Sequence, residues 1–76
     1  MGKIITITFE DVVKAIGINP GENEYMVIFK TQAAFYKIDK SKSPEIETLK
    51  NSKENGLEVS IVNNALTSEI LEVNLT

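Results

Sequence analysis

The sequence predicts one small α+β domain, residues 1–76, with helices packed on a five-stranded, mostly antiparallel sheet. Two observations lead to this fold class. Apolar and polar residues alternate in short stretches separated by turn residues, which is typical of antiparallel strands. One other stretch begins with serine, proline and acidic residues and ends with lysines and a glycine, which is typical of a helix. The expected order is strand, short helix, two strands, helix, two strands.

The first predicted strand is Lys3–Phe9, in which Ile5 and Ile7 are expected to face the core. Within it, the window Ile4–Thr8 has no charge and no proline, and it is rich in β-branched residues. Such a window promotes aggregation when it is exposed. We therefore expect it to lie inside the sheet or inside an interface.

The next stretch, residues 9–17, allows two interpretations. Thr8 and Asp11 are spaced as a capping pair, and a glycine and a proline follow, so a short helix over Phe9–Ile16 is expected. In the alternative, the first strand continues through a bend. Val12–Ile18 would then pair with Tyr25–Phe29 across a loop that contains Pro20 and Gly21.

The centre of the predicted sheet is a hairpin over Glu24–Asp39. Its five consecutive apolar residues, Tyr25–Phe29, are too many for a strand with one face in water, so both faces are expected to be covered. After a short polar break, a second strand alternates, with Tyr36 facing inward and Phe35 and Lys37 facing outward.

The last part of the chain combines a helix with a terminal hairpin. Ser43 is the expected N-cap of a helix over Pro44–Asn55, and Gly56 is expected to follow its C-terminus. Leu57–Val62 and Leu71–Leu75 alternate and predict the two strands of the hairpin.

The order and spacing of these elements over residues 24–75 resemble a known fold. A strand ending in Phe-Tyr-Lys-Ile leads through a polar helix to Gly-Leu-Glu-Val-Ser-Ile-Val and Glu-Ile-Leu-Glu-Val. This is similar to small domains of the oligonucleotide/oligosaccharide-binding (OB) fold. The resemblance implies a partly open five-stranded barrel whose binding face lies on the second and third strands. A helix over residues 9–17 would depart from that pattern.

Composition argues against catalysis. The chain has no histidine and no cysteine, and all its basic residues are lysines, so the usual general base, thiol nucleophile and guanidinium are missing. The neighbouring carboxylates Glu10 and Asp11 are explained by a solvated helix start. We therefore expect no catalytic residue, no metal site, no cofactor and no enzyme activity. No signal peptide or membrane span is expected, so the default location is the cytoplasm.

The first functional hypothesis is a protein–protein interface or self-association, for example as a homodimer. Apolar side chains are expected on strand faces opposite the core, and such a patch is typical of an interface. The candidate interaction face consists of Ile4, Phe35, Lys37, Val62, Leu66 and Ile70.

The alternative hypothesis is a binding site for single-stranded nucleic acid on the central hairpin. Aromatic rings beside lysines are what such sites use. The candidate residues are Lys30, Phe35, Tyr36, Lys37, Lys40 and Lys42. The net charge of −3 and the lack of arginine disfavour this alternative. Its affinity would fall steeply with salt, whereas an apolar protein interface would respond little.

Overall fold

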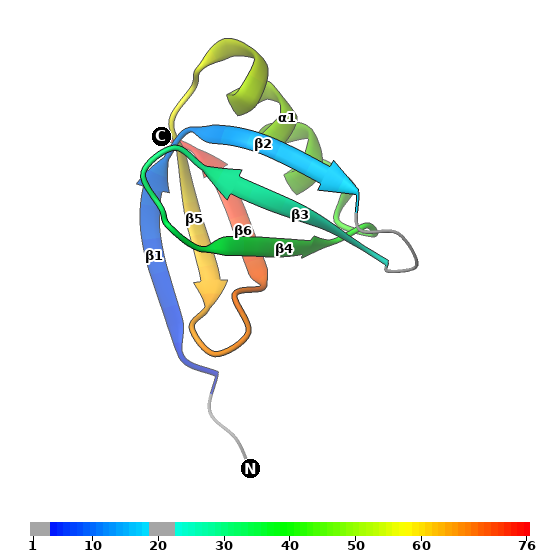
Figure 1. Ribbon diagram of the computed structural model, residues 1–76, viewed down its shortest axis with the longest axis vertical. Coiled ribbons are helices and arrows are strands. Elements are labelled where there is room, and N and C mark those ends of the chain that lie inside the picture. The colour runs from blue at the N-terminus through cyan, green and yellow to red at the C-terminus, as the bar shows by residue number, and fades with distance from the viewer. Residues whose placement is uncertain (1–3, 19–22) are drawn as a thin grey trace.

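The computed structural model describes residues 4–18 and 23–76, and this part of the chain forms two three-stranded antiparallel sheets and one helix (Figure 1). One sheet has the order β1–β5–β6 and the other the order β2–β3–β4. The two sheets cross at a steep angle, and α1 lies beside β2 and β6. The elements are β1 (Thr6–Asp11), β2 (Val13–Ile18), β3 (Glu24–Phe29), β4 (Phe35–Asp39), α1 (Ser43–Asn55), β5 (Val59–Asn64) and β6 (Ile70–Leu75).

The predicted five-stranded sheet or OB-like barrel is therefore wrong, because residues 4–18 and 23–76 form six strands in two sheets. The predicted helix over Phe9–Ile16 is wrong as well. This stretch contributes to β1 and β2, and Val13 pairs with Phe29 while Ile18 pairs with Tyr25, as the alternative interpretation expected. The stretch forms strands because they bury its apolar side chains against residues distant in sequence. Val13, for example, is 1% exposed in the core. Most of the predicted loop over 19–23 lies outside the described residues.

Backbone hydrogen bonds join the two sheets at two corners. Only Val12 separates β1 from β2, and its carbonyl accepts a hydrogen bond of 3.0 Å from the Lys30 N–H. At the other corner, the Lys37 N–H donates to the Ser68 carbonyl over 3.1 Å. The chain therefore passes from one sheet to the other as a single bent strand, and β4 is attached to the residues just before β6.

The central hairpin, the second helix and the terminal hairpin are confirmed. Gly56 ends α1 in the left-handed conformation with φ 66°, which glycine adopts without steric strain. Ser43 is the first helical residue and not the N-cap. The N-cap is Lys42, and its side chain makes no capping hydrogen bond.

The core lies between the two sheets and the inner side of α1. Leu49 and Ser52 of α1 are fully buried, and Ser52 links α1 to β2 and to the segment between α1 and β5. Its hydroxyl accepts a hydrogen bond from the Val13 N–H (3.0 Å) and donates one to the Leu57 carbonyl (2.6 Å). The rings of Phe9, Phe29 and Tyr36 pack with centroids 5.1–5.5 Å apart. The other core residues are Val27, Ile38, Ile46, Val59, Ile61, Ile70 and Val73.

Two expectations about side-chain direction are corrected. Ile70 was expected outside but is 0% exposed, because the pairing of β5 with β6 shifts between Val62 and Asn63 and places Ile70 opposite the buried Asn63. Ile5 and Ile7 were expected in the core but are 56% and 53% exposed. Figure 1 shows the reason: the first half of β1 extends beyond the β2–β3–β4 sheet.

Candidate functional site

Exposed apolar side chains gather around the turn that joins β5 to β6. Leu66 at this turn is 76% exposed, and Phe35 at the start of β4 is 64% exposed. The Ala65 N–H donates to the Ile5 carbonyl over 2.8 Å, so the start of β1 lies against the turn. We call this region the turn surface, and its apolar residues are Ile4, Ile5, Ile7, Phe35 and Leu66.

A shallow groove of about 160 Å³ lies between the turn and the hairpin of β3 and β4. Its lining residues are Glu24, Tyr25, Met26, Phe35, Tyr36, Lys37, Thr67 and Ser68. Lys37 Nζ lies 3.9 Å from Glu24 Oε2, so the charges at the border of the groove are paired. Such a groove suits a neutral or apolar side chain better than a polyanion.

The outer face of the β2–β3–β4 sheet extends this apolar region. Phe35 pairs with Ile28, and Ile28 pairs with Ala15, so the three form one row across the sheet. Val27 and Phe29 point into the core, and the alternation of a strand therefore directs Ile28 outward. In Figure 1 no helix lies over this face.

The candidate interaction face is only partly brought together. Phe35, Lys37, Ile4 and Leu66 lie around the turn, as described above. Val62 lies on the outer face of the other sheet, between Thr8 and Glu72. The buried Ile70 contributes nothing to an exposed face.

The candidate nucleic-acid face is dispersed. Tyr36 packs against Phe9 and Phe29, so its ring is not free to stack on a base. Lys40 lies over the Tyr25 ring, with Nζ 5.6 Å from its centroid. The remaining lysines are Lys30 just after β3, Lys37 in β4 and Lys42 just before α1. Lys30 and Lys40 lie at opposite ends of the hairpin, roughly 20 Å apart for a six-residue strand.

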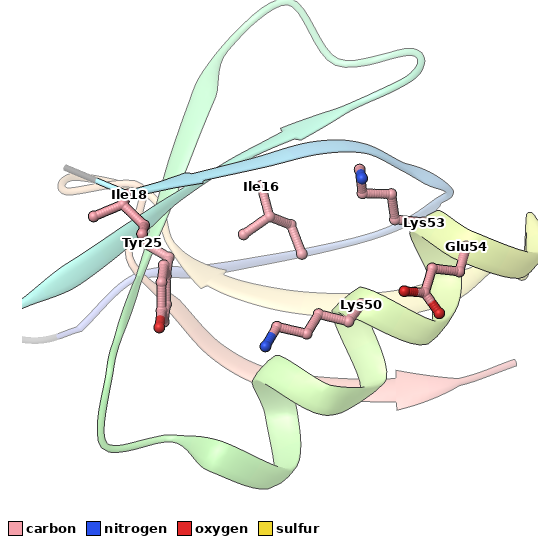
Figure 2. Close-up of a pocket in the computed structure, with 6 residues that line it drawn as sticks. All are labelled: Ile16, Ile18, Tyr25, Lys50, Lys53 and Glu54. Atoms are coloured by element: carbon pink, nitrogen blue, oxygen red, sulfur yellow. The ribbon is translucent and has the colours of Figure 1, made fainter.

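A second cleft, of about 420 Å³, lies between β2 and α1 (Figure 2). Ile16, Ile18 and Tyr25 line it from the strands, and Lys50, Lys53 and Glu54 line it from the helix. The helical side chains are exposed and carry both signs of charge. Sequence reasoning missed this cleft because residues 9–17 were expected to be helical, which hid the position of the two isoleucines.

The buried carboxylate of Asp11 stabilises the fold through hydrogen bonds from the backbone and from Thr31. It accepts hydrogen bonds from the Val12 N–H (2.7 Å), the Thr31 N–H (2.9 Å) and the Thr31 hydroxyl (2.6 Å). Burial alone would raise the pKa of Asp11, but these hydrogen bonds and the nearby Lys30 outweigh burial and lower it. Asp11 is thus held ionised as a link between β1 and the β3–β4 loop, and it is not poised as a general base.

The described part of the chain has neither a cluster of metal ligands nor a membrane-spanning helix. Within residues 4–18 and 23–76, no group of three or more histidine, cysteine or acidic side chains could hold a metal ion. In the same residues, no helix is long and apolar enough to cross a membrane.

The fold is similar to part of a solved proenzyme. The crystal structure of pro-protein-glutaminase matches with a TM-score of 0.81 and 24% identity, over 93% of this chain and 26% of that chain. A mutant of pro-protein-glutaminase matches with a TM-score of 0.78 and 22% identity, over 97% and 26% of the two chains. The chain therefore spans about a quarter of the length of these proteins, and the likeness is one of fold. No protein-family model and no curated protein matches the sequence. The predicted OB-like barrel is wrong, and the resemblance of residues 24–75 to OB domains in order and spacing stays an untested prediction.

Proposed function

We propose that this chain is a non-catalytic domain that binds a folded protein partner through the turn surface. The observation that carries the proposal is the exposure of Phe35 in a groove that is also lined by Thr67 and Ser68 of the turn, next to the exposed Leu66. Large apolar side chains exposed together are typical of protein interfaces, and aromatic residues contribute most to their binding energy.

The partner we propose is an amide-hydrolysing enzyme of the kind named by the two solved structures. The name pro-protein-glutaminase denotes a precursor of such an enzyme, and this chain is similar to about a quarter of it. Amide hydrolysis usually needs an activated nucleophile and a general base. A chain without cysteine or histidine is better suited to the part of a precursor that binds the enzyme than to the part that reacts.

A calorimetric titration of mature protein-glutaminase with this chain tests the proposal. We expect a complex, and the variant Phe35→Lys should weaken it at least about tenfold, because a charge would be buried where a ring was packed. The matched control is Ile18→Lys, which changes an isoleucine that is 70% exposed at the far end of β2.

Two results would contradict the proposal. Absence of a complex with the mature enzyme would exclude this partner class. Ammonia released from a glutamine-containing protein by the purified chain alone would exclude a non-catalytic role.

A further inference from the structure

The first half of β1 has a free backbone edge. Within the described residues, β1 pairs only with β5, where the Ile5 carbonyl accepts from the Ala65 N–H and Ile7 lies opposite Asn63. Backbone groups alternate in direction along a strand, so those of Thr6 and Thr8 face away from β5. In Figure 1 no other strand lies along the outer side of this half of β1.

This edge lacks the features that normally prevent strands from pairing between molecules. Native edge strands usually contain lysine, proline or a bulge. Residues 4–8 contain neither a charge nor a proline, and the pairing of β1 with β5 has no register shift. The side chains of Ile4, Ile5 and Ile7 are all more than half exposed. The edge therefore offers unpaired backbone groups flanked by apolar side chains.

We propose that a second copy of this chain pairs with β1 in antiparallel fashion. With the two-fold axis at Ile7, the Ile7 side chains of the two copies meet, and Thr6 lies opposite Thr8 of the second copy. Ile5 then lies opposite Phe9 of the second copy, on the same face of the sheet. The only charged residue in the stretch 4–10, Glu10, lies opposite Ile4, so no like charges meet.

The resulting assembly is one continuous six-stranded sheet across a two-fold axis. Because the contact involves a few residues of one strand, its buried area is below that of a stable dimer, and association is weak and concentration-dependent. Phe35 takes no part in the pairing. The pairing uses the isoleucines of the turn surface, whereas the binding of a protein partner proposed above is assigned to Phe35, so the variant Phe35→Lys distinguishes the two.

Sedimentation equilibrium of the whole chain, from micromolar to millimolar concentration, tests this inference. We expect a monomer–dimer equilibrium that Ile7→Lys weakens at least about tenfold. Thr6→Pro should do the same, because it removes an N–H that faces the free edge and is not needed for pairing with β5. The control Ile18→Lys adds the same charge at a similarly exposed isoleucine on β2 and should leave the equilibrium unchanged.

Amide hydrogen exchange gives a second measurement on the unmodified chain. The Thr6 and Thr8 amides should become protected only at the concentrations at which the dimer forms. The inference is overturned if the chain stays monomeric at all concentrations, if these amides exchange equally fast throughout, or if Ile7→Lys dimerises as the parent does. A dimer that Phe35→Lys dissociates would overturn it too, because that result places the contact at Phe35 and not at the free edge of β1.

Discussion

The two ends of β1 differ in how much of the protein surrounds them. At one end, Asp11 is 5% exposed and accepts three hydrogen bonds. Directly before the other end, Ile5 is 56% exposed, and its backbone is joined to the sheet on the β5 side by the hydrogen bond from the Ala65 N–H. Both residues lie on the same face of the strand by its alternation. The contrast teaches that the crossing of the two sheets, and not the pattern within the strand, decides which residues are buried.

The largest expected difference between the two ends comes from removing one apolar side chain at each. Phe29→Ala, beside the buried end, should lower the free energy of unfolding by about 3–5 kcal/mol, because it leaves a cavity against Phe9 and Tyr36. Ile7→Ala should lower it by less than about 1 kcal/mol, since Ile7 is 53% exposed. Urea unfolding measures both, and equal losses would mean that β1 is buried along its whole length.

A smaller effect is expected from the carboxylate that holds the buried end. Asp11→Ala removes the acceptor for the N–H groups of Val12 and Thr31, and should lower the free energy of unfolding by about 1–3 kcal/mol. The matched variant is Glu10→Ala, an exposed neighbour, which should change it by less than about 0.5 kcal/mol. A loss at Glu10 as large as at Asp11 would contradict the assigned role of the buried carboxylate.

The same carboxylate predicts a pH dependence. The pKa of Asp11 is lowered in the folded state, so the unfolded chain binds this proton more readily. The stabilisation from Asp11 is therefore complete well above its ordinary pKa of about 3.9 and is lost as the pH falls below that value. Urea unfolding at pH 7 and pH 3 should show a larger loss for the parent than for Asp11→Asn. An identical loss in both proteins would show that other carboxylates cause the whole pH effect.

The exposed residue Phe35 of the turn surface should tolerate substitution with little loss of folding stability. Phe35→Lys is expected to alter the free energy of unfolding by less than about 0.5 kcal/mol, because the ring is 64% exposed. Thermal unfolding followed by circular dichroism measures this. If Phe35→Lys lowered the free energy of unfolding by more than about 2 kcal/mol, Phe35 would support the fold. Weaker partner binding by this variant could then not be attributed to a lost interface contact.

The smallest expected effect is the binding of nucleic acid to the central hairpin. The lysines of the central hairpin lie apart, and Lys37 is paired with Glu24, so a single-stranded oligonucleotide should bind only weakly at low salt. Fluorescence anisotropy at several salt concentrations measures this binding. Tight binding that weakens steeply with salt and is lost in Phe35→Ala would favour the nucleic-acid hypothesis instead.

The elements with strong local signals could be predicted from the sequence. The helix α1 has a proline in its first turn and ends at a glycine, and both hairpins alternate clearly. The helix predicted within residues 9–17 was wrong because the capping signal of Thr8 and Asp11 is local. The residue that Asp11 binds in the structure, Thr31, lies far along the chain. A long-range hydrogen bond of this kind has no signature in the sequence around Asp11.

The candidate site was predicted only in part for a related reason. Phe35 and Leu66 were expected outside and are exposed, because strand alternation and turn position are local properties. Ile70 was misplaced by one irregular step in the pairing of β5 with β6. A one-residue shift exchanges the two faces of a strand, and no residue in this hairpin indicates the shift at the level of sequence.

The pairing of β1 with β5 also has a consequence for how the chain folds. Thr6 pairs with Asn64, about three quarters of the chain length away, whereas β2, β3 and β4 pair with their neighbours in sequence. Closing so long a loop is entropically unfavourable until most of the remaining contacts exist. We therefore expect β1 to join the protein late during folding. The strand that directly follows the exposed Ile4 and Ile5 would then also be the last to pair with its partner strand.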